Sequence, residues 1–147
     1  MDEKENILVV CSQNSARSQM AEAYIRRHLG GRFRVMSAGV RPSRVHALTI
    51  QVLEEDGFDV SAHTAKSIDE FLGKLPVRYL ILVCGKADRE CPGAFPGQPE
   101  RMFWPFDDPA AAEGTPERRL QTFRRVRGQI AARVRAWALE LESENNA

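Results

Sequence analysis

The stretch from residue 7 to residue 18 reads Ile-Leu-Val-Val-Cys-Ser-Gln-Asn-Ser-Ala-Arg-Ser and decides how the fold begins. Ile7 to Val10 are an unbroken aliphatic run rich in β-branched residues, which is typical of a strand covered on both faces in a parallel sheet. From Arg17 to Leu29 apolar side chains recur at helical spacing, and Gly30-Gly31 ends that pattern. The residues between strand and helix therefore form a loop, with Cys11 at its start.

The rest of the chain continues this alternation of strands and helices. The pattern predicts strands at 34–36 and 79–83, a short strand or extended segment at 102–106, a helix at 46–55, and a last helix that starts near Thr115-Pro116 and carries an apolar stripe from Leu120 to Leu141. Parallel strands joined by right-handed crossovers need helices over both faces of the sheet. We therefore predict a three-layer α/β/α fold with a central parallel four-stranded sheet, built as one domain over residues 1–147.

Composition limits the classes of partner. The chain has 21 Lys and Arg against 20 Asp and Glu, so no overall field draws nucleic acid or an anionic membrane to it. A stripe of arginines on the last helix is interrupted by Glu residues, which makes it a poor nucleic-acid site. The charged start MDEKEN leads directly into a short apolar run, without a secretory signal or a membrane span. We expect a cytoplasmic monomer that binds neither nucleic acid nor membrane.

The loop after the first strand has the features of a tetrahedral-oxyanion site. Backbone N–H groups of Ser12, Gln13, Asn14, Ser15 and Ala16 precede a helix start, where amides and the helix dipole favour an anion, and Arg17 offers two parallel hydrogen bonds. The same field favours the thiolate of Cys11, and Ser18 is placed to donate a hydrogen bond to its sulfur. Asn14 tolerates left-handed backbone geometry. We predict a nucleophilic cysteine beneath a bound oxyanion.

Three further side chains follow later strands. Cys84 ends the strand at 79–83, Cys91 lies seven residues on, and Asp108 follows the segment at 102–106. Ligands bind beyond the carboxyl ends of parallel strands, so Cys84 and Asp108 are expected near Cys11. Each thiol taken alone could be a small buried hydrophobe. A zinc site is disfavoured because Cys84 and Cys91 are too far apart for a zinc knuckle and no His clusters with them, so no metal is expected.

Three motifs carry a resemblance to a known family. The segments are Cys11-Ser12-Gln13-Asn14-Ser15-Ala16-Arg17-Ser18-Gln19-Met20-Ala21-Glu22, Cys84-Gly85-Lys86-Ala87-Asp88-Arg89-Glu90-Cys91-Pro92 and Phe106-Asp107-Asp108-Pro109-Ala110. Together they resemble the nucleophile loop, redox segment and acid loop of the thioredoxin-coupled arsenate reductases, which share the low-molecular-weight tyrosine phosphatase fold. The resemblance implies a flavodoxin-like sheet, reduction of arsenate to arsenite without a cofactor, and thioredoxin as reductant.

The same resemblance implies the order of the chemistry. Cys11 forms a covalent adduct with arsenate while Asp108 acts as the acid, Cys84 attacks Cys11, and Cys91 then attacks Cys84. The product is a Cys84–Cys91 disulfide for thioredoxin to reduce. Asp107 is a second candidate for the acid, but the residue directly before Pro109 matches the family position. Because two bonded cysteines need α-carbons within about 7 Å, the segment between Cys84 and Cys91 must be mobile or unwind.

Three positions depart from the family pattern. Gln13 stands where Gly is common, and it fits if the loop needs no positive φ there. Ala16 stands where Cys is often found, but the mechanism needs no fourth thiol. Some members resemble this chain at Asn14, Glu22 and Ser37 and hold potassium with an Asp at the position of Lys66, so we expect the Lys66 ammonium to take the place of that ion.

The main alternative is a low-molecular-weight protein tyrosine phosphatase. The same loop, thiolate and acid hydrolyse phosphate esters through a cysteinyl-phosphate. Phosphatases of that branch usually have aromatic residues after the Asp-Pro pair, whereas this chain has Ala110-Ala111-Ala112, and they do not need Cys84 and Cys91. We therefore favour arsenate reduction, with weak phosphatase activity as a by-product of the shared loop.

Overall fold

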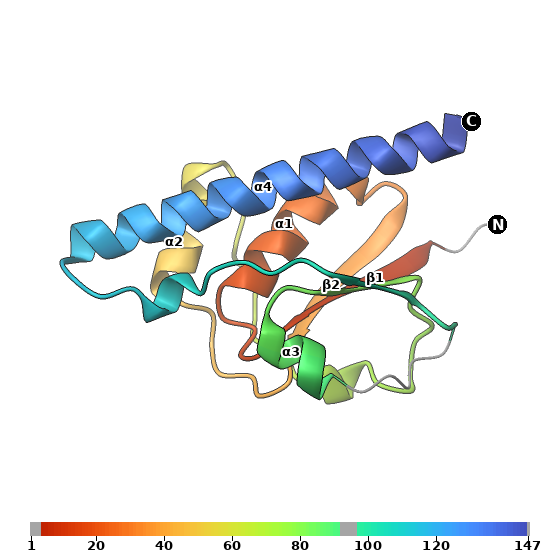
Figure 1. Ribbon diagram of the computed structural model, residues 1–147, viewed down its shortest axis with the longest axis horizontal. Coiled ribbons are helices and arrows are strands. Elements are labelled where there is room, and N and C mark those ends of the chain that lie inside the picture. Colours follow the sequence, from red (N-terminus) through yellow and green to blue (C-terminus); the bar gives the residue numbers. More distant parts are fainter. Residues whose placement is uncertain (1–3, 92–96, 147) are drawn as a thin grey trace.

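The computed structural model describes residues 4–91 and 97–146, and Figure 1 shows a central sheet with helices on both sides. The strands are β1 Glu5–Cys11, β2 Phe33–Gly39, β3 Tyr79–Leu82 and β4 Glu100–Phe103. The α-helices are α1 Arg17–Leu29, α2 Ala47–Glu55, α3 Gly85–Glu90 and α4 Pro116–Asn146, and short 3-10 helices lie at Ile68–Glu70 and Pro109–Ala111. All paired strands run parallel in the order β2-β1-β3-β4, which confirms the predicted sheet.

The register of the sheet places the loop after β1 beside the segment after β3. Val10 of β1 pairs with Ala38 of β2 on one side and with Leu82 of β3 on the other. The aliphatic run from Ile7 to Val10 is fully buried, as expected for a central parallel strand. Cys11, the last residue of β1, and Cys84, which follows β3, therefore lie at the same edge of the sheet.

Helices α1, α2 and α4 pack against one another on one side of the sheet, and α3 lies on the other side (Figure 1). The predicted stripe of α4 is buried at six positions: Phe123, Val126, Ile130, Val134, Trp137 and Leu141. The ring of Trp137 meets Trp104 and Tyr79 edge to face, with centroids 5.4 and 5.1 Å apart. Both tryptophans are core residues.

The structure differs from the prediction in three details. Helix α2 begins at Ala47 rather than at His46, because His46 is the N-cap and its Nδ1 accepts the Leu48 N–H at 3.0 Å. The strand predicted at 102–106 lies at Glu100–Phe103. Helix α3 was not predicted, because six residues are too few to show a period.

Residues 92–96, which include Pro92 of the redox segment, lie outside the described residues. Within 4–91 and 97–146, no helix is long and apolar enough to cross a membrane.

Candidate active site

The loop after β1 turns its carbonyl groups away from the pocket that it surrounds. The carbonyl oxygens of Cys11, Ser12, Gln13 and Ser15 accept the backbone N–H groups of Val40, Arg41, Ser43 and His46, at 2.7–3.1 Å. The N–H and C=O of a peptide unit point in opposite directions. The segment from 40 to 46 therefore holds the loop with its N–H groups facing inward, the arrangement that an anion requires.

Asn14 is the left-handed residue of this loop. Its φ is 53°, as its residue type allows, and Gln13 has no positive φ, so the loop accepts a side chain there. Gly39 makes room for the turn, because a Cβ at this position would lie 2.8 Å from the Asn14 nitrogen. Asn14 Oδ1 accepts the backbone N–H of Lys66 at 2.8 Å and Gln19 Nε2 at 3.0 Å. A backbone N–H can only donate, so this contact fixes the orientation of the Asn14 amide.

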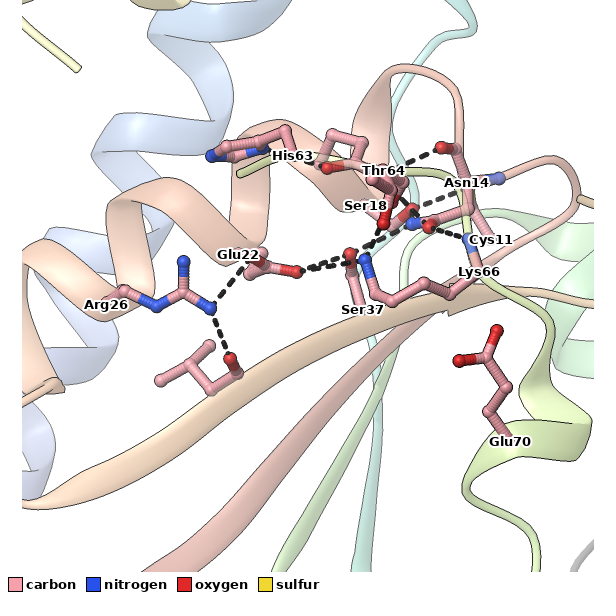
Figure 2. Close-up of polar contacts among 12 residues, drawn as sticks. Cys11, Asn14, Ser18, Glu22, Arg26, Ser37, His63, Thr64, Lys66 and Glu70 are labelled. Carbon is pink, nitrogen blue, oxygen red and sulfur yellow. Dashed lines mark hydrogen bonds and ion pairs between the residues drawn. The ribbon is translucent and has the colours of Figure 1, made fainter. Parts of the chain in front are cut away.

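A chain of buried hydrogen bonds leads from Glu22 to the Cys11 sulfur (Figure 2). Ser37 donates to Glu22 Oε1 at 2.6 Å, and Asn14 Nδ2 donates to Ser37 Oγ at 2.9 Å and to Ser18 Oγ at 2.7 Å. Ser18 Oγ lies 2.9 Å from Cys11 Sγ, as the sequence predicts. Since Ser18 Oγ already accepts from Asn14, its hydroxyl proton is free to point at the sulfur. The backbone N–H of Asn14 also donates to Cys11 Sγ, at 3.2 Å.

Two cations face the buried carboxylate of Glu22. Arg26 Nη2 lies 2.9 Å from Glu22 Oε2, and Lys66 Nζ lies 3.9 Å from Oε1 while donating to the Thr64 carbonyl at 2.7 Å (Figure 2). Burial of a carboxylate is costly unless cations and hydrogen-bond donors lie beside it, and here both are present. The Lys66 ammonium thus lies beside the hydrogen-bonded group of Glu22, Ser37 and Asn14.

A small pocket opens above this network. It is lined by Cys11, Ser12, Gln13, Ser15, Ala16, Arg17, Asp108 and Ala110. Of the predicted loop residues, Asn14 is absent from this lining because it is fully buried beneath the sulfur. Arg17 is held by the Phe106 carbonyl, which accepts Nη1 at 3.2 Å, and its Nη2 lies 3.8 Å from Asp108 Oδ2. Sequence reasoning missed this anchoring carbonyl, since nothing in a side chain marks it.

The two acidic candidates point in different directions. Asp108 lines the pocket and faces Arg17. Asp107 is mostly exposed, and its Oδ2 lies 3.4 Å from Arg125 Nη1 on α4. The geometry therefore favours Asp108 over Asp107 as the group that can reach a bound anion.

Cys84 and Cys91 lie at the two ends of α3 and do not line the pocket. All three cysteines are free and buried. Cys84 is the N-cap of α3, and its sulfur accepts the Ala87 N–H at 3.3 Å. Burial raises the pKa of the Cys91 thiol to about 11, although Arg101 opposes this effect. In this state Cys91 is a sheltered, protonated thiol.

His46 and His63 make structural contacts away from the pocket lining. His63 Nδ1 lies 2.9 Å from Gln19 Oε1, and burial lowers its pKa. Burial also lowers the pKa of His46, whose ring packs against Phe123 at a centroid distance of 4.8 Å. Among residues 4–91 and 97–146, no three His, Cys, Asp or Glu side chains form a metal-binding group.

Fold and site together define an α/β protein with a buried cysteine and a loop of inward-facing N–H groups at the carboxyl edge of a parallel sheet. The model of the low molecular weight phosphotyrosine protein phosphatase family matches residues 6–147. The chain belongs to this family.

Several relatives are named arsenate reductase. One from Halalkalibacterium halodurans is 41% identical over 136 residues, which cover 92% of this chain and 96% of the relative. One from Bacillus subtilis is 36% identical over 137 residues, with coverage of 92% and 96%. Among solved structures, an arsenate reductase in its oxidized state has a TM-score of 0.77 and 32% identity, covering 92% of this chain and 98% of that one.

The fold also extends to phosphatases of low sequence similarity. The tyrosine phosphatase Wzb from Escherichia coli K30, solved with sulphate, has a TM-score of 0.74 at 19% identity, with 95% of this chain and 99% of that one covered. This likeness concerns the fold alone.

Proposed function

We propose that this chain reduces arsenate to arsenite and that Cys11 is its nucleophile. The observation that carries the proposal is the placement of thiols: Cys11 lies beneath the anion pocket, and Cys84 follows the neighbouring strand at the same sheet edge. Relatives named arsenate reductase, 36–41% identical over nearly the whole chain, support the same reaction. An arsenate reductase at 32% identity has been solved in a phosphate binding state, which supports a tetrahedral oxyanion as the ligand.

In the proposed first step the Cys11 thiolate attacks arsenic. The loop amides and Arg17 bind the arsenate oxygens, and Asp108 protonates the oxygen that leaves as water. The proton on Ser18 stabilises the thiolate before attack, since its hydroxyl lies 2.9 Å from the sulfur. A Cys11–arsenic(V) adduct results.

The electron transfer is assigned to the other two thiols. Cys84 attacks the Cys11 sulfur, the electron pair of the sulfur–arsenic bond passes to arsenic, and arsenite leaves. Cys91 then attacks the Cys84 sulfur and releases Cys11 as a thiolate. The two electrons that reduce arsenic come from the Cys84 and Cys91 thiols, which end as a disulfide.

This sequence requires α3 to unwind. Cys84 and Cys91 are separated by two helical turns, which at a rise of 1.5 Å per residue place their α-carbons about 10 Å apart. A disulfide needs about 7 Å or less. We propose that thioredoxin reduces the resulting disulfide, in line with the cysteine pattern of the redox segment.

A coupled assay tests the proposed function. Arsenate-dependent NADPH oxidation in the presence of thioredoxin and thioredoxin reductase is expected for the wild-type chain and is expected to be lost in Cys11→Ser. Mass spectrometry of Cys91→Ser treated with arsenate is expected to show a Cys11–Cys84 disulfide. Absence of that disulfide would contradict the proposed order of thiols.

A second candidate function, phosphate ester hydrolysis, has support from the family match. The pocket would bind phosphate in the same way, but Ala110 contributes to its lining and offers no aromatic surface for a tyrosine ring. Only slow hydrolysis of p-nitrophenyl phosphate is therefore expected. Turnover of this ester without arsenate-dependent NADPH oxidation would make the phosphatase assignment the better one.

A further inference from the structure

Helix α3 packs on the sheet through small side chains. Ala87 is fully buried, and Cys84 and Cys91 at the two ends are nearly so. Small side chains bury little apolar area, and the gain is only about 25 cal/mol for each Å². Polar contacts from outside the helix therefore contribute much of the stability of folded α3.

One such contact comes from Arg101 on strand β4. Arg101 Nη2 donates to the carbonyl oxygen of Asp88 at 2.5 Å and lies 3.5 Å from Asp88 Oδ1. The backbone of Arg101 is opposite Leu80 of β3 in the parallel ladder, so the guanidinium extends from a part of the sheet that can stay fixed while α3 moves.

The helical backbone does not supply the usual donor for the Asp88 carbonyl. In an α-helix the Asp88 carbonyl would accept the N–H of residue 92, but residue 92 is proline and has none. The last carbonyls of a helix need such partners from outside, and a cation there also suits the helix dipole. Arg101 thus caps the carboxyl end of α3.

The cap lies next to the bond that holds Cys91. The Cys91 N–H donates to the Ala87 carbonyl at 2.8 Å, one residue before the carbonyl that Arg101 binds. We propose that Arg101 is a positioning residue for the disulfide step: by capping α3 it keeps Cys91 buried and apart from Cys84 until the helix opens. The role in turnover rests on the proposed function, whereas the cap itself does not.

Capping and charge predict opposite effects of removing Arg101. The guanidinium lowers the pKa of Cys91 against the effect of burial, so loss of the charge alone makes this thiol less reactive. Loss of the cap lets α3 open more often and makes Cys91 more reactive, because a buried thiol is labelled through the open state.

Thiol labelling of the reduced full-length chain separates these effects. Iodoacetamide labelling of each cysteine is followed by mass spectrometry of a digest. Arg101→Met is expected to speed labelling of Cys91 about three- to tenfold, as for loss of one hydrogen bond of ordinary strength at a partly exposed site. Arg101→Lys is expected to lie between wild type and Arg101→Met. The control is Arg78→Met, whose ion pairs are with Glu5 and Glu100 and which is expected to leave Cys91 labelling unchanged.

Unchanged or slower labelling of Cys91 in Arg101→Met overturns the proposal. An equal acceleration at Cys11 also overturns it, because the whole fold would then have loosened. If Arg101→Met does not fold, the comparison of Arg101→Lys with wild type decides by the same criterion. The labelling experiment needs no arsenate. If labelling is as expected but the wild-type chain does not reduce arsenate, the capping role of Arg101 is supported and the proposed function is refuted.

Discussion

At the residue scale, the hydrogen bond from Ser18 to the Cys11 sulfur joins the buried network to the pocket. Its direction follows from the neighbouring contacts, since the Lys66 N–H fixes the Asn14 amide and this amide donates to Ser18. A serine hydroxyl oriented in this way has its proton available for the sulfur. In the proposed reaction Ser18 therefore stabilises the Cys11 thiolate, and it does so from outside the pocket lining.

Ser18→Ala tests this contact. Loss of a hydrogen bond to a charged group costs about 1.5–3 kcal/mol, so kcat/KM for arsenate is expected to fall roughly ten- to hundredfold. Ser43→Ala is the control, because its hydroxyl contacts Gln13 and not the sulfur. The coupled assay measures both variants, and wild-type activity in Ser18→Ala would show that the sulfur does not need this donor.

Lys66 makes a second prediction at this scale. Its ammonium lies 3.9 Å from Glu22 Oε1 and donates to the Thr64 carbonyl, so the polar space beside Glu22 already holds a cation. We expect equal activity in potassium and sodium salts at the same ionic strength, since general screening does not distinguish them. A large and specific activation of the wild-type enzyme by potassium, measured in the coupled assay, would contradict this assignment.

At the scale of single elements, α4 is held by its buried stripe. Ile130 is fully buried in it, whereas Leu139 on the same helix is 60% exposed. Ile130→Ala is expected to lower the free energy of unfolding by about 2–5 kcal/mol, because it leaves a cavity in the core. Leu139→Ala is expected to change it by less than about 0.5 kcal/mol. Urea unfolding measures both, and equal effects would contradict the observed packing of α4.

Glu55 joins α2 to α4. Its carboxylate accepts Arg124 Nη2 at 2.6 Å and Arg127 Nη1 at 2.9 Å. The hydrogen bond from Arg124 is the main cause that lowers the pKa of Glu55 in the fold. A carboxyl whose pKa is lower in the folded state stabilises the fold at neutral pH and loses that contribution as the pH falls below its ordinary value.

Glu55→Gln should therefore unfold a few degrees below wild type at pH 7, and the difference should shrink as the pH falls below about 4, where the wild-type carboxyl becomes protonated too. Thermal unfolding at several pH values measures this difference. Glu54→Gln provides a neighbouring exposed control. A difference that persists undiminished into acid would mean that Glu55 acts through packing rather than charge.

At the scale of the whole molecule, we propose that residues 1–147 are a single cooperative domain. Trp104 follows the edge strand and Trp137 lies on α4, and their contact reports on the packing of helix against sheet. Tryptophan fluorescence and far-ultraviolet circular dichroism are expected to give coincident urea transitions. Two separated transitions would divide the chain into more than one unit.

Most of the fold could be predicted from sequence because its signals are local. The aliphatic run at 7–10, the stripe of α4 and the glycines after α1 each specify one element through backbone preference and side-chain period. The loop residues could be proposed because a cysteine between a strand and a helix meets the requirements of an anion site. Helix α3 was missed because its six residues are held by caps and tertiary contacts rather than by an apolar period.

By itself, the sequence determined the parallel α/β architecture. Residue type and spacing also supplied the residues of the proposed site, namely the loop that starts at Cys11, Cys84, Cys91 and Asp108. Only the tertiary structure decided which side chains meet. It directed Asp107 toward Arg125 and Asp108 toward Arg17, placed Lys66 beside Glu22, and brought Arg101 to the end of α3. These contacts join residues that are distant along the chain, and the packing of separate elements sets their geometry.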